Sequence, residues 1–391
     1  MRTRHAAGTR RARAKGTFAV ITGGGTAGHV LPALAIADAL VAKGHPPASI
    51  RFVGSRRGQE ARAVPQAGYA VTLLPGRGIV RKLDGRSLVA NGAALAALGV
   101  AFVRSVAMIA ARRPAVVVSV GGYASVPYAV AAAIFKVPVL LVNTDALPGA
   151  ANRLVGRFAR RCAVAFPETP LPRAALTGAP LRREFELCPS PDAARAAGAR
   201  AELGLPSDMP VVAAVGGSLG ARRINDAVAE MVDRWRRADA GPVAVYHVVG
   251  RRDWDRVRSG PTPGAGSSGV LYTVVPYEER MAALYCAADV VVCRAGAITV
   301  AELGAVGTPA VLVPFPGAPG DHQSANARAL VRAGAGVIVR DDQCTAERLD
   351  EVVGGLLRDA RRLDQMAVSA RGLRRAGAAA AIVDLVEEVA A

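Results

Sequence analysis

The chain has 391 residues, of which 51% are hydrophobic but only 4% aromatic, so we expect two domains with cores of Ala, Val and Leu. Its formal charge of +18 comes almost entirely from arginine; this suits nucleic acid, anionic lipid or phosphorylated substrates, or reflects only codon bias. No two of the five cysteines have C-x-x-C spacing, which argues against a zinc site and indicates a reduced chain.

The start of the chain is basic. Residues 1–16 lack the apolar core of a secretory signal, so we expect a disordered tail that could touch anionic surfaces. Further on, the most apolar stretch is residues 87–103, which contains Asn91 and ends at Arg104. It is short and interrupted for a membrane span and predicts a buried or interfacial helix.

Short runs of Val, Ile and Leu alternate with Ala- and Leu-rich segments of helical length. Continuous apolar runs of this kind are typical of parallel strands that are buried on both faces. The alternation predicts an α/β chain with two Rossmann-like, doubly wound parallel-sheet domains facing a cleft. The expected strands are residues 17–22, 49–54, 115–120, 138–143, 210–215, 243–249, 289–293 and 309–315.

An internal repeat supports two similar halves. Residues 17–40 and 210–232 both begin with a strand, continue through a glycine turn and end in a helix. Each is the opening unit of a Rossmann-like half, and a ligand is expected between the halves. The expected division is the tail 1–16, an N-terminal domain of 17–178, a C-terminal domain of 179–371, and a last helix, about 372–391, packed back on the first domain.

The first glycine turn carries a nucleotide-type signature. Residues 23–28 satisfy G-x-G-x-x-G between a strand and a helix, and His29 follows directly. Glycines let main-chain amides approach an oxyanion, and the helix adds the positive end of its dipole. Alone, the turn also suits an NADP-linked oxidoreductase, because Arg56 and Arg57 follow the second expected strand, where an NAD enzyme has an acid.

The interpretation as a dehydrogenase does not explain two later features of the sequence. A second glycine turn stands at 216–217, and residues 293–327 predict a strand, a glycine turn, a helix bearing Glu302, another strand and a loop. A carboxylate one turn into a helix can accept hydrogen bonds from both ribose hydroxyls, while the helix N-terminus faces a diphosphate. These features favour a nucleotide-sugar site.

Several aspartates stand where helices are expected to begin. Asp321 can cap the helix after it, whose first turn carries His322 and Gln323 as hydrogen-bond donors for a sugar. Asp253 and Asp255 form a D-x-D pair, which metal-dependent transferases use. They also precede an expected helix, so we interpret them as capping residues and expect no required metal.

A set of motifs, in order and at matching spacing, resembles the MurG family of GT-B glycosyltransferases, glycosyltransferase family 28. The likeness runs from about residue 17 to the C-terminus. The motifs are GGGTAGHVLPALAIADAL (23–40), GRG (76–78), VVSVGGYASVPYAVAA (117–132), TGAPLR (177–182), GGSLGARRIN (216–225), MAALYCAADVVVCRAGAITVAEL (281–303), VPF (313–315) and DHQSANA (321–327).

The resemblance implies an inverting transfer of N-acetylglucosamine from UDP-N-acetylglucosamine to the 4-hydroxyl of undecaprenyl-diphospho-N-acetylmuramyl-pentapeptide, in peptidoglycan synthesis. The expected partners are these substrates and an anionic membrane surface, with a peripheral enzyme on the cytoplasmic face and no cofactor. A related GT-B enzyme with another lipid or small-molecule acceptor and an NADP-linked oxidoreductase stay open. No aromatic-rich basic motif supports a nucleic-acid partner.

The resemblance also implies roles for particular residues. His29 is the expected base, since a neutral imidazole takes up a proton near pH 7; a structural hydrogen bond is the other interpretation. Glu278 is expected to meet uracil through its main chain only. The expected UDP-N-acetylglucosamine site is Thr26, Ala27, Gly28, Asp145, Arg182, Ser218, Glu278, Glu302, His322 and Gln323. The expected acceptor and diphosphate loops contain Gly24, Gly25, Gly121, Gly122 and Tyr123.

A membrane contact is expected at residues 76–86, which mix apolar and cationic side chains. Apolar groups can enter the bilayer while cations meet anionic headgroups. A solvated loop is the other interpretation. The expected contact residues are Ile79, Val80, Arg81, Lys82 and Leu83.

The chain departs from the family pattern at four places. Ala27 replaces a glycine, Ala179 an asparagine and Leu219 a glutamine. Residues 142–145 read Val-Asn-Thr-Asp where the family has H-E-Q-N, beside the acceptor and donor-sugar pocket. This last change is the reason for keeping another acceptor open.

Overall fold

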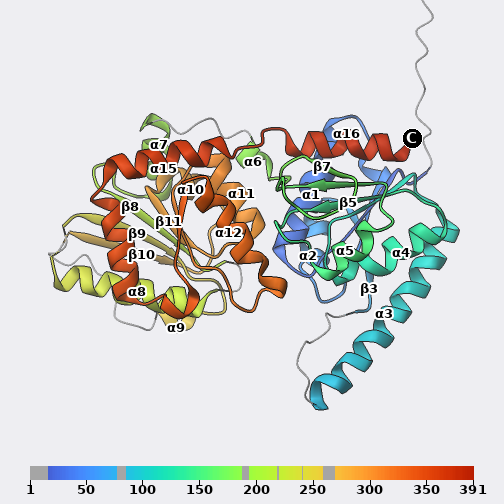
Figure 1. Ribbon diagram of the computed structural model, residues 1–391, viewed down its shortest axis with the longest axis horizontal. Helices are drawn as coiled ribbons and strands as arrows, with labels where there is room; N and C mark the ends of the chain where they lie inside the picture. Colours follow the sequence, from blue (N-terminus) through green and yellow to red (C-terminus); the bar gives the residue numbers. More distant parts are fainter. Residues whose placement is uncertain (1–15, 77–84, 187–192, 218–219, 240, 259–268) are drawn as a thin grey trace, which may run out of the picture.

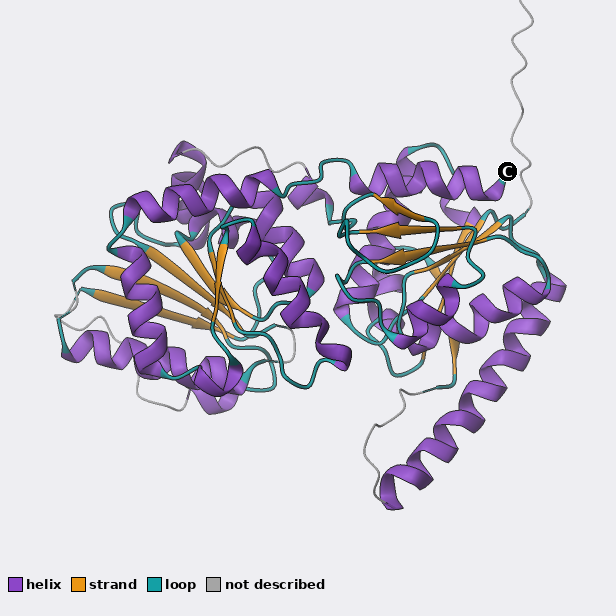
Figure 2. Ribbon diagram, in the orientation of Figure 1, coloured by secondary structure: helices purple, strands orange, loops and turns teal. Residues whose placement is uncertain are grey.

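The computed structural model describes residues 16–76, 85–186, 193–217, 220–239, 241–258 and 269–391. They form two α/β domains, each built on one sheet with helices against it (Figures 1 and 2). All the strand pairs are parallel. The predicted fold class, two doubly wound parallel-sheet domains, is therefore confirmed.

The first domain has a seven-stranded sheet in the order β3-β2-β1-β4-β5-β6-β7. Its strands are β1 (Ala19–Thr22), β2 (Ile50–Ser55), β3 (Ala70–Leu74), β4 (Val116–Ser119), β5 (Val139–Asn143), β6 (Arg161–Val164) and β7 (Ala174–Leu176). Its helices are α1 (Ala27–Ala42), α2 (Glu60–Gln66), α3 (Gly85–Ala111), α4 (Val126–Ile134), α5 (Ala150–Gly156) and, from the end of the chain, α16 (Ala378–Ala390).

Both faces of this sheet are covered. Ala19 and Ile21 of β1 pack with residues of α1, α2 and α16, whereas Val20 packs with residues of α3, α4 and α5 on the other face. Successive side chains of a strand point to opposite faces, so a strand covered on both sides must be apolar at every position. This is why the central strands have uninterrupted apolar sequences.

The second domain has a six-stranded sheet in the order β10-β9-β8-β11-β12-β13. Its strands are β8 (Val211–Val215), β9 (Val243–Val248), β10 (Val270–Val275), β11 (Val290–Cys293), β12 (Ala310–Leu312) and β13 (Gly336–Ile338). Its helices are α6 (Arg183–Glu186), α7 (Ala193–Leu203), α8 (Arg222–Arg237), α9 (Trp254–Arg258), α10 (Met281–Ala287), α11 (Ala297–Val306), α12 (His322–Arg332), α13 (Ala346–Leu349), α14 (Gly355–Leu357) and α15 (Ala360–Gly372).

The chain passes between the domains twice. Leu181 and Phe185 already pack in the core of the second domain, so the first crossing lies just after Gly178. The second crossing joins α15 to α16, which lies along the first domain (Figure 1). Helix α16 buries Ile382 and Val386 against that domain.

Five strands in the described residues were not among the expected ones. Of these, β3, β7, β10 and β13 are the edge strands of the two sheets. They are only partly buried, so their sequences lack the long apolar runs of central strands. The fifth, β6, is short and begins with Arg161.

Helix α3 is longer than the stretch 87–103 and extends away from its domain (Figure 1). Within it, Asn91–Ala111 is long and apolar enough to cross a membrane by length and composition alone, so the apolar helical stretch is longer than the expected residues 87–103. One stripe of the helix, containing Ala101 and Ile109, packs in the core of the first domain. Leu95 and Val103, in contrast, are 58% and 66% exposed.

Candidate active site

Loops that follow strands of the two sheets meet between the domains. Asp145 comes after β5 of the first domain, and its Oδ1 lies 3.0 Å from Nδ2 of Asn326 on α12 of the second. His29, in the first turn of α1, is close enough to Asp145 and His322 for both to act on its pKa. The two domains therefore meet at the carboxyl ends of their strands, where open α/β sheets bind ligands.

The first glycine loop encloses a carboxylate of the protein itself. Glu60, at the start of α2, is 3% exposed and accepts hydrogen bonds from the amides of Gly25 (2.9 Å) and Ser55 (2.6 Å). A Cβ on Gly24 would lie 2.1 Å from this carboxylate. The Gly25 amide thus binds Glu60, which corrects the expectation that it serves a substrate diphosphate.

The loop at Gly121 and Gly122 packs directly on the first glycine loop. Gly121 and Gly122 have φ of +92° and +79°, and a Cβ on Gly122 would lie 2.6 Å from the carbonyl oxygen of Gly24. Only glycine can make this approach. Tyr123 then begins a short 3₁₀ turn, and its hydroxyl donates to Ser55 Oγ at 3.1 Å. The loops predicted to lie together are brought together.

His29 sits at the edge of these loops. Its Nδ1 lies 3.2 Å from the Thr26 hydroxyl. Burial lowers the pKa of His29, the negative charges of Asp145 and Glu60 raise it, and His322 lowers it, with a net decrease. The imidazole is therefore neutral near pH 7, the form that a general base requires.

The segment that departs from the family pattern is tied down by its own hydrogen bonds. Val142 packs in the core of the first domain. Asn143 is buried; its Nδ2 donates to the carbonyl oxygen of Asp145 at 2.6 Å, and its Oδ1 accepts from Asn152 at 2.7 Å. These contacts aim the turn at Asp145 and Ala146 toward the second domain.

A buried polar network lies behind the glycine turn of the second domain. Asn225, on α8, donates to the carbonyl oxygen of Val249 (2.9 Å) and to Asp253 Oδ2 (3.0 Å), and its Oδ1 lies 3.1 Å from His247 Nε2. Burial lowers the pKa of His247 to about 3, so this ring is neutral. Asp253 thus has a structural partner, while Asp255 is exposed. No group of three or more His, Cys, Asp or Glu in the described ranges could hold a metal ion.

Glu302 lies on α11 and is 6% exposed. Burial raises its pKa to about 7, Glu184 acts in the same direction, and the Arg182 guanidinium opposes them. Arg182 lies between the two carboxylates, with its Nη1 2.9 Å from Glu184 Oε1 and its Nη2 3.8 Å from Glu302 Oε1. A buried acid beside a cation is a typical ligand-binding feature.

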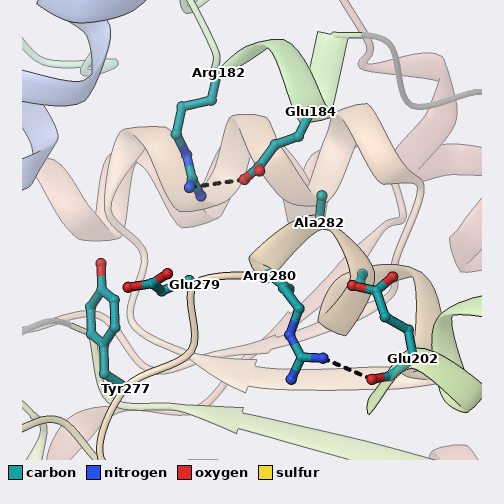
Figure 3. Close-up of a pocket in the computed structure, with 8 residues that line it drawn as sticks. Arg182, Glu184, Glu202, Tyr277, Glu279, Arg280 and Ala282 are labelled. Atoms are coloured by element: carbon teal, nitrogen blue, oxygen red, sulfur yellow. Dashed lines mark hydrogen bonds and ion pairs between the residues drawn. The ribbon is translucent and has the colours of Figure 1, made fainter. Parts of the chain in front are cut away.

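A cavity of about 640 Å³ opens beside this pair (Figure 3). Arg182 borders it on one side, and Tyr277 and Arg280 on the other. Glu278 points away from ligand space: it is buried and accepts from the Tyr246 hydroxyl (2.6 Å) and the Arg280 amide (2.8 Å). A nucleoside fits a cavity of this size, and Glu278 fixes the turn that lines it.

The first turn of α12 presents two side chains with defined donors and acceptors. His322 Nδ1 donates to the carbonyl oxygen of Pro319 at 2.8 Å, which leaves Nε2 as the ring nitrogen for a ligand. Gln323 Oε1 accepts from the Phe315 amide at 2.9 Å, which leaves its NH₂ group as a donor. Asp321 precedes the helix, but its carboxylate accepts from the Ser324 hydroxyl and caps no backbone amide.

Some predicted residues lie outside the part of the chain that the structure describes: Ser218, Leu219, the expected membrane contacts at 79–83 and the side chain of Ala27. Two site residues were missed. Glu60 stands five residues beyond Ser55, whereas an acid was expected directly at the end of the second strand. Asn326 lies one turn beyond His322, in a motif of which only the first residues were given a role.

Known protein families match both domains of the chain. Residues 19–164 match the family described as glycosyltransferase family 28 N-terminal domain, and residues 211–384 match the glycosyltransferase family 28 C-terminal domain. A protein of Desulforudis audaxviator is 38% identical over 379 residues, covering 95% of this chain and 98% of its own. One of Nocardioides sp. is 41% identical over 355 residues, with coverages of 90% and 93%. Both are named UDP-N-acetylglucosamine--N-acetylmuramyl-(pentapeptide) pyrophosphoryl-undecaprenol N-acetylglucosamine transferase.

Solved structures give the same result. The crystal structure of MurG from Acinetobacter baumannii is 26% identical and covers 95% of this chain and 99% of its own, with a TM-score of 0.72. The glycosyltransferase of kitacinnamycin has a TM-score of 0.69 at 18% identity and coverages of 96% and 98%, a likeness of fold alone.

Proposed function

The chain belongs to glycosyltransferase family 28, and from that premise we propose that it builds a lipid-linked disaccharide of the cell wall. It transfers N-acetylglucosamine from UDP-N-acetylglucosamine to the 4-hydroxyl of undecaprenyl-diphospho-N-acetylmuramyl-pentapeptide, with inversion at the anomeric carbon. Relatives that carry the corresponding name are similar along almost the whole chain. The observation that supports the proposal is a neutral His29 on the first domain, close enough to His322 on the second for the charge of His322 to act on its pKa.

The donor is held by the second domain. Uracil enters the cavity beside Tyr277, and the ribose hydroxyls donate to Glu302 once that carboxyl is ionised. The diphosphate meets the N-terminus of α11 and the Arg182 guanidinium, which offers paired donors. The sugar hydroxyls then donate to His322 Nε2 and accept from the NH₂ group of Gln323.

The chemical step needs one base and one site for developing negative charge. With Nδ1–H directed to Thr26, Nε2 of His29 takes the proton of the acceptor 4-hydroxyl as that oxygen bonds to the anomeric carbon. The bond from the anomeric carbon to the diphosphate oxygen breaks, and UDP leaves with its electrons. Main-chain amides and helix dipoles stabilise the leaving diphosphate, so we propose that no metal is required.

The transfer is tested with radiolabelled UDP-N-acetylglucosamine and a short-chain muramyl lipid, with and without EDTA. We expect a labelled lipid-linked disaccharide in both cases. Diacylglycerol and a small aglycone in parallel reactions test the alternative acceptor that the segment 142–145 raises. Label on either of these and none on the muramyl lipid would overturn the acceptor assignment, and loss of transfer in EDTA would overturn the metal-free mechanism.

We further propose that the enzyme works at the cytoplasmic face of the membrane as a peripheral protein. The exposed apolar side of α3, with Leu95, Val100 and Val103, would lie in the interface. The basic segment 76–86, most of it outside the described residues, precedes it and would meet anionic headgroups.

Sedimentation with lipid vesicles tests this contact. We expect binding to anionic vesicles to exceed binding to neutral ones, and the double variant V100D/V103D to bind several-fold less. Val368→Asp is the matched control, since Val368 is 60% exposed but lies on α15 of the second domain. Equal binding to both vesicle types, or an equal loss in the control, would contradict the proposal.

A further inference from the structure

One buried carboxamide joins the two domains where their loops meet. Asn326 is 0% exposed. Its Oδ1 accepts from the Ala146 amide at 2.8 Å, and its Nδ2 donates to Asp145 Oδ1 at 3.0 Å and to the carbonyl oxygen of Ala295 at 3.2 Å. Ala146 and Asp145 belong to the first domain, whereas Asn326 and Ala295 belong to the second. Both the acceptor and the donor group of this single side chain are used.

The groups it joins stand next to both halves of the proposed reaction. On the donor side, Asn326 lies one turn beyond His322 and Gln323 on α12. Ala295 directly precedes Gly296, which starts the helix that carries Glu302. A displacement of the donor site would therefore move the Asn326 side chain.

On the acceptor side, the contact is equally direct. Asp145 acts on the pKa of His29, the proposed base. Hydrogen bonds of Asn143 and Asn152 hold the turn at Asp145 and Ala146. Because the turn is held, a displacement of Asn326 would change the position of Asp145 relative to His29.

We infer that Asn326 is a positioning residue that couples donor binding on the second domain to alignment of the acceptor on the first. This inference rests on the proposed function. Without the bridge each domain keeps the groups that bind its own substrate, but the anomeric carbon and the activated hydroxyl are no longer held in register. A misplacement of about 1 Å between reacting atoms can reduce a rate about 100-fold.

Kinetics and binding of Asn326→Ala test the inference. We expect kcat to fall about 10- to 100-fold, while the Kd for UDP-N-acetylglucosamine, measured by calorimetry, stays within about twofold because no proposed donor contact is removed. Arg328→Ala is the control, since Arg328 is exposed on the same helix. An unchanged kcat, or an equal loss of donor affinity and kcat, would overturn the inference.

A second measurement does not depend on activity. Hydrogen exchange of the Ala146 amide reports the bridge itself, and we expect it to be slow in the wild type and fast in Asn326→Ala, including with UDP-N-acetylglucosamine bound. Equal exchange in the two proteins would overturn the inference, whereas absence of transfer by the wild type would overturn only the proposed function. If Asn326→Ala fails to fold, Asn326→Ser is measured in the same two ways. Its predicted results are the same.

Discussion

Donor binding should weaken as the pH falls through neutrality, because Glu302 must be ionised to accept from both ribose hydroxyls. Burial raises the pKa of Glu302 from 4.5 to about 7, which corresponds to about 3 kcal/mol in favour of the protonated carboxyl. The fraction ionised is then about one tenth at pH 6 and about nine tenths at pH 8. Since only the ionised fraction is competent, the apparent Kd should rise about tenfold from pH 8 to pH 6.

Calorimetry with UDP-N-acetylglucosamine measures this directly, because the diphosphate diester of that ligand does not titrate between pH 6 and 8. Binding at pH 6 should release about one proton, seen as a dependence of the heat on the ionisation enthalpy of the buffer. Glu302→Gln should bind more weakly and lose most of the pH dependence. A wild-type Kd that is constant from pH 6 to 8, or an equal pH dependence in Glu302→Gln, would refute the reasoning.

Three further changes test the first domain. Gly122→Ala places a Cβ 2.6 Å from a carbonyl oxygen at a φ of +79° and should cost about 1–3 kcal/mol in urea unfolding, whereas Gly149→Ala, with no atom within 4 Å, should not. Glu60→Ala leaves the buried Ser55 amide and the partly buried Gly25 amide without their partner and should cost about 1–3 kcal/mol; a midpoint equal to that of the wild type would contradict this. Asp145→Asn removes a charge that raises the pKa of His29, so the acid limb of the kcat profile should move to lower pH; a limb that stays in place would count against it.

The fold class followed from the sequence because central strands such as β1 and β8 are covered on both faces and must be apolar throughout. The edge strands β3 and β13 could not be predicted in this way, because a partly exposed strand need not be apolar at every position. The sequence predicted a helix shorter than α3, because Asn91 and Arg104 interrupt the apolar run. Only one stripe of the helix is buried, so polar residues can stand on its other sides.

In the site, the motifs pointed to His29 and His322, which lie close enough for His322 to act on the pKa of His29. The motifs could not show which amides are already occupied. The G-x-G-x-x-G pattern is equally consistent with a substrate phosphate and with a carboxylate from the same domain, and only the position of Glu60 decides between them. Contacts between domains, such as that of Asn326, depend on distant parts of the chain and have no local pattern.

The central claim is that His29 takes the proton of the acceptor hydroxyl. The most direct test compares wild type and His29→Ala in transfer from UDP-N-acetylglucosamine to the muramyl lipid, with donor binding measured on the same preparations. The account predicts a kcat reduced about 10²- to 10⁴-fold and a donor Kd within about twofold of wild type. A His29→Ala enzyme that transfers at the wild-type rate would contradict it.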